Sequence, residues 1–420
     1  MNISRISRSI VVAIFMIFIV FFCYFDISAI LNKSSDTIIV SNLIKISYAV
    51  LLIILVLMYL YIKTKLYKMK VKRKITFIYR YIYLSLVVSV ITFLMITKTL
   101  PDISNIAKFI SILIVLFTAF AIKKIIFNVS KSDTLSVLGM FGFSMIFNVI
   151  KDKSIYLDSI LITFSVVSVI LLMQLIIDEL KQRGIKNKKY LILSVCLGIF
   201  MGITCLLGIN IIVYILISII FVFITSNLDS THLNFPKKIM NSITQKNRER
   251  LYKIERININ KLIYVVVTYL FLTIVVFYVG KFALSKISNK VDSQVLINIE
   301  QNIKNNELSK ENINLNIKHF SSNFVKNVKE LVNYSKTYYL IMFVYIILVE
   351  ILAFMLKRRY DTKSTSMKIY LMLIFISISM FNINIIYFQP IITTFLILIA
   401  IVNTTNIYLN REERVKMLVA

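Results

Sequence analysis

Apolar residues gather along the chain in runs of about 17 to 19, separated by polar and basic segments. An α-helix rises about 1.5 Å per residue, so each run crosses most of a hydrocarbon core roughly 30 Å thick. The pattern predicts an all-α polytopic membrane protein. Its twelve candidate spans are residues 9–25, 46–62, 81–97, 109–126, 134–150, 160–177, 190–207, 210–226, 262–280, 338–356, 369–386 and 390–408.

The stretch 151–227 shows the pattern most clearly. A polar segment with Asp152 and Asp158 leads into one apolar run, and a basic hinge at 181–189 follows. Two further runs then meet at Gly208-Ile209-Asn210, which predicts a helical hairpin with its turn at these residues.

Composition supports the membrane class. The 420 residues are 58% hydrophobic with a mean hydropathy of +0.82, more apolar surface than a soluble fold of this size buries. The net charge of +29 would suggest nucleic acid in a soluble protein, but the basic residues lie between the apolar runs. We therefore expect the lipid bilayer, and no nucleic acid, as partner. Cys23, Cys196 and Cys205 lie inside apolar runs without paired spacing, so we expect no disulfide framework, metal site or cofactor.

The basic residues also predict the topology. With the N-terminus inside, the tails and cytoplasmic gaps carry 34 of the 49 Lys and Arg, and the short external gaps carry 6. Cytoplasmic loops of membrane proteins hold the excess of Lys and Arg. Both termini are therefore predicted to be cytoplasmic.

Three regions follow from this topology. Residues 1–280 hold nine spans and a basic cytoplasmic loop, 227–261, which anchors to anionic lipid or docks a cytoplasmic partner. Residues 281–337 form a long external loop, and 338–420 hold three spans and a short cytoplasmic tail. Within the loop, spacings of three and four predict an amphipathic helix with an apolar face of Ile313, Ile317, Phe320, Phe324, Val328 and Leu331.

Candidate chemistry is sparse. The one acid inside a span is Glu350, which is either functional or protonated and paired in its apolar site. Soluble-enzyme motifs are absent, so catalysis would rest on external acids acting as general bases, for which the candidates are Asp26, Asp102 and Asp158. Nearby groups that could bind a phosphate-bearing substrate are Lys98, Lys151, Lys153 and His319. The alternative is that these aspartates mark helix ends, with Asp158 as the N-cap before residue 160.

Glycine is also informative, because transporters often place their sites at glycine-broken helices. Only two pairs offer such a break here, Gly139 with Gly142 and Gly198 with Gly202. This scarcity argues against a secondary transporter of that kind.

Residues 105–227 resemble the core of C-type integral membrane glycosyltransferases, which use polyprenyl-phosphate sugars. The resemblance rests on NIAKFISILIVLFTAFAIKKI, then IYLDSILITF, then KNKKYLILSVCLGIFMGIT. It implies transfer of a sugar from a polyprenyl-phosphate donor to an acceptor at the external face, with an aspartate as base and Asp158 at the external acidic position. The resemblance is to a diverged example, because the first external gap is short and Cys205 follows GIT where the family has Lys or Arg.

Two other functions stay open. A polysaccharide polymerase or lipid-linked glycan flippase fits twelve spans and a late external loop, and a non-catalytic accessory protein or permease needs no external acid. High Ile, Lys and Asn without Trp indicate an AT-rich bacterial source, so we expect a multi-pass protein of the bacterial cytoplasmic membrane.

Overall fold

A computed structural model gives α-helices, and the turn of one helical hairpin, throughout the part of the chain that it describes. Among these residues the all-α prediction is confirmed. Among the described residues, four helices are long and apolar enough to cross a membrane: Phe109–Val129, Ile160–Leu180, Lys189–Leu206 and Asn260–Leu284. The described residues are 50, 53–66, 73–99, 105–130, 133–146, 153–181, 189–230, 259–288, 322, 324–330, 343–348, 351, 362–381, 392, 394, 396 and 398–400.

Most of these helices are longer than the apolar runs that predicted them. Each apolar run covers only the part of its helix that is long enough to cross the hydrocarbon core of a membrane. The hydrogen bonds of the helix backbone continue into the polar residues on either side of the run. Gly139 and Gly198, which belong to the two glycine pairs that could have offered a break, both lie inside continuous helices. The bounds are α3 (Arg73–Thr99), α4 (Asn105–Ser130), α5 (Asp133–Ile146), α6 (Lys153–Lys181), α7 (Lys189–Leu206), α8 (Ile211–Ser230), α11 (Ile259–Ser288) and α15 (Thr362–Phe381).

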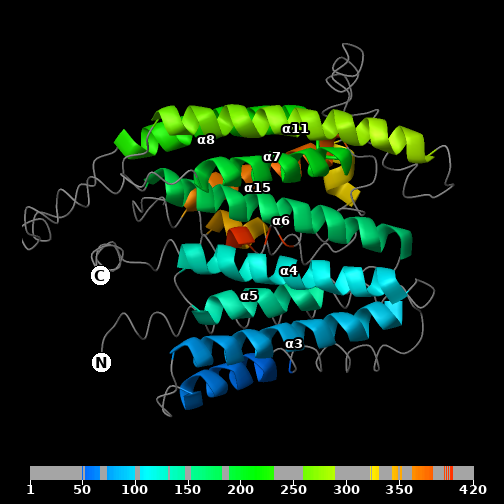
Figure 1. The fold of residues 1–420 in the computed structure, drawn as a ribbon, viewed down its shortest axis with the longest axis vertical. Coiled ribbons are helices and arrows are strands. Elements are labelled where there is room, and N and C mark those ends of the chain that lie inside the picture. Colours follow the sequence, from blue (N-terminus) through cyan, green and yellow to red (C-terminus); the bar gives the residue numbers. More distant parts are fainter. Residues whose placement is uncertain are drawn as a thin grey trace, which may run out of the picture. The chain divides into compact units, whose positions relative to one another are not determined.

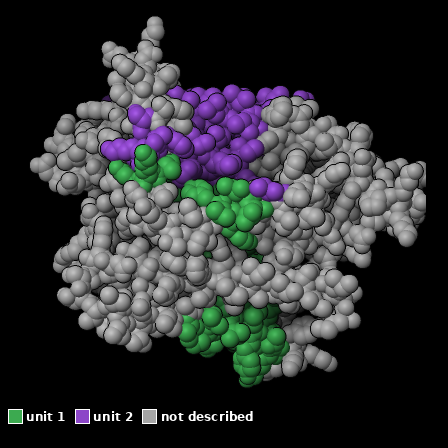
Figure 2. Space-filling view, turned by 180° about the vertical axis from the view of Figure 1, so that it is seen from behind, with its two compact units in different colours: residues 1–167, 328–349, 384–404 green, residues 168–327, 350–383, 405–420 purple. Residues whose placement is uncertain are grey.

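The chain divides into two compact units, coloured separately in Figure 2. Unit 1 comprises residues 1–167, 328–349 and 384–404, and unit 2 comprises residues 168–327, 350–383 and 405–420. The division falls within α6, a feature that hydropathy along the chain does not predict.

In unit 1, α3, α4 and α5 pack against one another (Figure 1). Tyr81 of α3 stacks on Phe120 of α4, with ring centroids 5.5 Å apart. The helix over residues 53–66 joins them, because the Tyr83 hydroxyl of α3 donates to the carbonyl of Leu55 at 3.3 Å. Through Tyr81 and Tyr83, α3 is therefore in contact with two neighbouring helices.

In unit 2, α7 and α8 form the predicted hairpin. Gly208 adopts φ 121°, which only glycine reaches without strain, and the Ile209 amide donates to the Thr204 carbonyl at 3.0 Å. Asn210 caps the next helix, because its side-chain oxygen accepts from the Ile212 amide at 2.9 Å. The turn predicted at 208–210 is confirmed.

Helix α11 lies along α7 in close contact, and the two run in parallel. An added Cβ at Gly198 would lie 2.6 Å from Leu272 Cβ, and one at Gly202 would lie 2.6 Å from Val276 Cβ. Further along both helices, Gly280 faces Leu206. Small residues that let backbones approach closely are the usual means of packing helices in membranes.

The hydrophilic regions are shorter than predicted at their borders. Helix α11 continues to Ser288 and so takes the first part of the loop predicted at 281–337. Likewise α8 ends at Ser230 and α11 begins at Ile259, inside the borders of the loop predicted at 227–261. Residues 324–330 are helical, within the predicted amphipathic helix, and the rest of both loops lies largely outside the described residues.

Candidate functional site

Four helices of unit 1 converge on one carboxylate, that of Asp133. Asp133 is the first residue of α5, where its negative charge interacts favourably with the positive end of the helix dipole. Its backbone carbonyl accepts from the Ser136 hydroxyl at 2.7 Å, which fixes the first turn. Tyr59 and Lys63 stand four residues apart and so share one face of the helix over residues 53–66.

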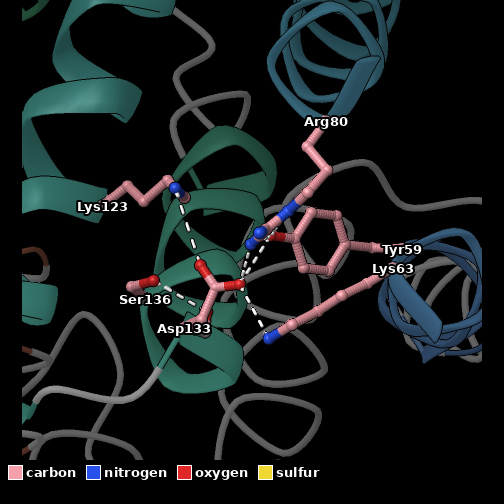
Figure 3. A network of polar contacts seen from close by, with 6 residues as sticks. All are labelled: Tyr59, Lys63, Arg80, Lys123, Asp133 and Ser136. Carbon is pink, nitrogen blue, oxygen red and sulfur yellow. Dashed lines mark hydrogen bonds and ion pairs between the residues drawn. The ribbon is translucent and has the colours of Figure 1, made fainter. Parts of the chain in front are cut away.

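Three cations and a phenol surround this carboxylate (Figure 3), and we call Tyr59, Lys63, Arg80, Lys123 and Asp133 the Asp133 cluster. Oδ2 of Asp133 accepts from the Tyr59 hydroxyl at 2.8 Å and from Lys63 Nζ at 3.1 Å. Arg80 Nη2 donates to the same oxygen and to the Tyr59 hydroxyl, and Arg80 Nε donates to Tyr59 at 3.0 Å. Lys123 Nζ pairs with the other oxygen, Oδ1, at 3.8 Å.

Aromatic rings support the cations of the cluster. The Arg80 guanidinium lies over the Tyr59 ring, 5.3 Å from its centroid. Lys123 Nζ lies 5.0 Å from the centroid of Tyr81, the ring that stacks on Phe120. Aromatic faces attract cations through their quadrupole, most strongly where water is partly excluded. The rings therefore fix the positions of both basic groups.

The cluster is partly buried and remains open to the surface. The side chains are exposed by 18% for Asp133, 12% for Lys123, 23% for Arg80 and 39% for Lys63. Burial acts to raise the pKa of Asp133. The hydrogen bond from Tyr59 and the charges of Arg80 and Lys63 outweigh it and hold that pKa below its usual value. Asp133 is thus a stably ionised anion among three cations.

Sequence reasoning missed this cluster, because it treated the basic residues as markers of topology. The signal was present in the two gaps that the topology places on one side, 63–80 and 123–133. Together they hold eleven Lys and Arg and a single acid, Asp133. An acid so heavily outnumbered is expected to draw several cations to itself. The structure brings the ends of both gaps together, a relation that the predicted alternation requires.

The predicted site residues lie elsewhere. Asp158 and Lys153 belong to α6 and Lys98 belongs to α3. At these positions the structure describes the helix but not the side chains. The N-cap interpretation of Asp158 is wrong, because α6 begins at Lys153 and the helix already includes this residue. The candidates outside the described residues are Asp26, Asp102, Lys151, His319 and Glu350.

Unit 2 holds a second polar group, built from neutral hydroxyls. The Tyr214 hydroxyl of α8 bonds to Thr204 of α7, and its ring lies 6.5 Å from the ring of Tyr370 in α15. Among the described residues, the buried hydroxyls of Tyr370 and Ser377 make no hydrogen bond. Hydrogen bonding between helices accounts for the pair of Thr204 and Tyr214, which carries no charge.

Two of the cysteines are described, and both lie in α7, Cys196 half-buried and Cys205 buried. They form no disulfide with each other. Cys23 lies outside the described residues.

Comparison with protein-family models, with curated proteins and with solved structures gives no match to this chain.

Proposed function

We propose that this chain is a membrane protein of cell-envelope glycan assembly that binds a sugar linked to polyprenyl phosphate. The observation that carries the proposal is the Asp133 cluster, in which three cations on largely apolar helices share one carboxylate. A polyprenyl-phosphate sugar joins an apolar chain to an anionic phosphate. Apolar helix faces that end in Arg and Lys offer complementary surfaces for both parts.

In the first form of the proposal, the protein is a diverged glycosyltransferase. The sugar moves from its phosphate to an acceptor hydroxyl at the external face, and an aspartate takes the proton of that hydroxyl. Asp26, Asp102 and Asp158 are the candidate bases. The sequence resemblance over residues 105–227 supports this form.

The position of the cluster favours a second form, a flippase for a lipid-linked glycan. Lys63, Arg80, Lys123 and Asp133 all belong to gaps predicted to be cytoplasmic, whereas the candidate bases are predicted to be external. A flippase receives its lipid at the cytoplasmic face, which is where the predicted topology puts the cations. Accessory and permease roles need no such phosphate site.

The two forms are separated by one reconstitution. The full chain is placed in proteoliposomes with a fluorescent polyprenyl-phosphate sugar, and both transfer to acceptors in an envelope extract and accessibility to an external quencher are measured. Transfer that Asp158→Asn abolishes supports the glycosyltransferase, and translocation without transfer supports the flippase. If the labelled lipid neither binds nor moves, the proposal fails and an accessory or permease role replaces it.

A further inference from the structure

The charges of the Asp133 cluster do not balance. Lys63, Arg80 and Lys123 face the single carboxylate of Asp133. The exposed lysines Lys65 and Lys124 adjoin the cluster on the same helices. Within residues 53–66 and α3, α4 and α5 as described, Asp133 is the one acid. This end of unit 1 is therefore strongly positive, and an anion placed there is attracted.

The hydrogen bonds of the cluster leave donors unused. The described bonds of Arg80 come from Nε and Nη2, so its Nη1 group makes none within the described residues. Lys63 donates one of its three N–H groups to Asp133. The distance from Lys123 Nζ to Asp133 Oδ1 is 3.8 Å, which is too long for a hydrogen bond. The spare donors of Arg80 and Lys63 belong to side chains that reach the surface.

From this geometry we propose that Lys63, Arg80 and Lys123 form a binding site for the phosphate of a membrane lipid, and that Asp133 competes with that phosphate for the same cations. The inference deepens the proposed function by naming its phosphate subsite, and it rests on that function only for the identity of the lipid. A phosphate offers more acceptor oxygens than a carboxylate, and the forked guanidinium binds two of them at once. Asp133 holds the cations in place and lowers the affinity for the ligand.

Competition has a consequence that a purely structural carboxylate lacks. Asp133→Asn keeps the size of the side chain and an oxygen that accepts from Tyr59, but it removes the negative charge. We expect this variant to bind a lipid phosphate roughly tenfold more tightly, the scale of one partly screened charge. Arg80→Gln removes the fork and is expected to bind roughly tenfold more weakly.

The test uses the full chain in phosphatidylcholine nanodiscs, with binding measured by thermophoresis. The probes are a short polyprenyl monophosphate, the uncharged polyprenol, phosphatidylglycerol and inorganic phosphate. Lys261→Gln is the matched control, because Lys261 is also a lysine over a tyrosine ring, 5.5 Å from that of Tyr190, but on α11 of unit 2. Thermal unfolding checks each variant, and Lys63→Gln replaces Arg80→Gln if the latter fails to fold.

Tighter binding by Asp133→Asn, weaker binding by Arg80→Gln or Lys63→Gln, and no change in Lys261→Gln support the inference. If Asp133→Asn binds more weakly or the same, the carboxylate is not a competitor and the inference is overturned. Equal binding of phosphatidylglycerol and polyprenyl phosphate keeps the phosphate site but counts against the proposed function. Binding of inorganic phosphate that matches the lipids rejects a membrane lipid as the ligand.

Discussion

At the residue scale, the protonation of Asp133 decides how firmly its cluster holds. The folded-state pKa of this carboxyl lies below its usual value near 3.9, because the hydrogen bond and charges around it outweigh its burial. A lowered pKa means that the ionised form favours folding. The stabilisation is therefore complete above about pH 5, and it is lost as the pH falls below about 4 through the folded-state pKa.

We predict that Asp133→Asn lowers the free energy of unfolding by roughly 1–3 kcal/mol at pH 7, because it removes a charged acceptor from three donors. Thermal unfolding in detergent, run from pH 8 to pH 3, measures the difference from the wild type. That difference should stay constant down to about pH 5 and shrink below about pH 4. A difference that persists unchanged at pH 3 would show that charge is not its origin.

Tyr59 gives a second prediction at the same scale. Its hydroxyl donates to Asp133 at 2.8 Å and accepts from Arg80 Nε at 3.0 Å. Tyr59→Phe removes this hydroxyl, so both charged partners lose a hydrogen bond. We expect a loss of about 1–2 kcal/mol. The control is Tyr83→Phe, which removes one longer bond to a backbone carbonyl at 3.3 Å and should cost about 0.5 kcal/mol. Equal losses for the two variants would contradict the special position of Tyr59.

At the scale of helices, the contact of α7 with α11 depends on the absence of side chains. A Cβ at Gly198 would come within 2.8 Å of the Tyr269 carbonyl oxygen, and backbone cannot yield as a side chain can. We predict that Gly198→Ala lowers the stability of the chain by about 1–3 kcal/mol through this overpacking.

The matched control lies one residue along the same helix. Ile199 is 39% exposed, so Ile199→Ala removes little packing and should change the unfolding temperature far less. Chemical unfolding in mild detergent compares the two variants. If Gly198→Ala is as stable as Ile199→Ala, the two helices can separate without loss and the close contact is not important for stability.

The helices could be predicted from sequence, whereas for the Asp133 cluster the sequence holds only an excess of cations over one acid in the gaps 63–80 and 123–133 and not the contacts themselves. An apolar run and a turn such as Gly208-Ile209-Asn210 are local patterns, and the structure confirms both. In the cluster, Arg80 contacts Tyr59, which lies 21 positions earlier in the chain, and Asp133, which lies 53 positions later. How the helices pack decides which charged side chains meet, and the periodicity of apolar residues along the sequence does not predict that packing. Helix ends were also misjudged, because hydropathy does not register the polar turns of a helix.

At the scale of the whole molecule, the two units each agree with an alternating path across the membrane. In unit 1, the ends of the gaps 63–80 and 123–133 meet at Asp133. In unit 2, Lys261 lies over Tyr190, so α11 and α7 begin at the same end, which is the arrangement expected of the seventh and ninth of the twelve predicted spans. These are relations between helices, and the side of the membrane that each end faces stays a prediction.

Cysteine labelling tests that prediction. In a chain whose own cysteines are replaced, single cysteines are placed at Lys65, Lys124 and Lys310, and an impermeant maleimide is added to intact cells. We expect labelling at Lys310 alone, because the positive-inside rule puts the other two positions in the cytoplasm.

Each other pattern has its own meaning. Labelling at only one of Lys65 and Lys124 would place the two gaps on opposite sides, and Asp133 could then not pair with both Lys63 and Lys123. Labelling at both, with Lys310 protected, would keep the cluster intact and invert the protein. In an inverted protein the cluster would face the outside of the cell, and the candidate bases would face the cytoplasm. The flippase form would then lose its cytoplasmic entry site, and the phosphate site would serve a lipid in the outer leaflet.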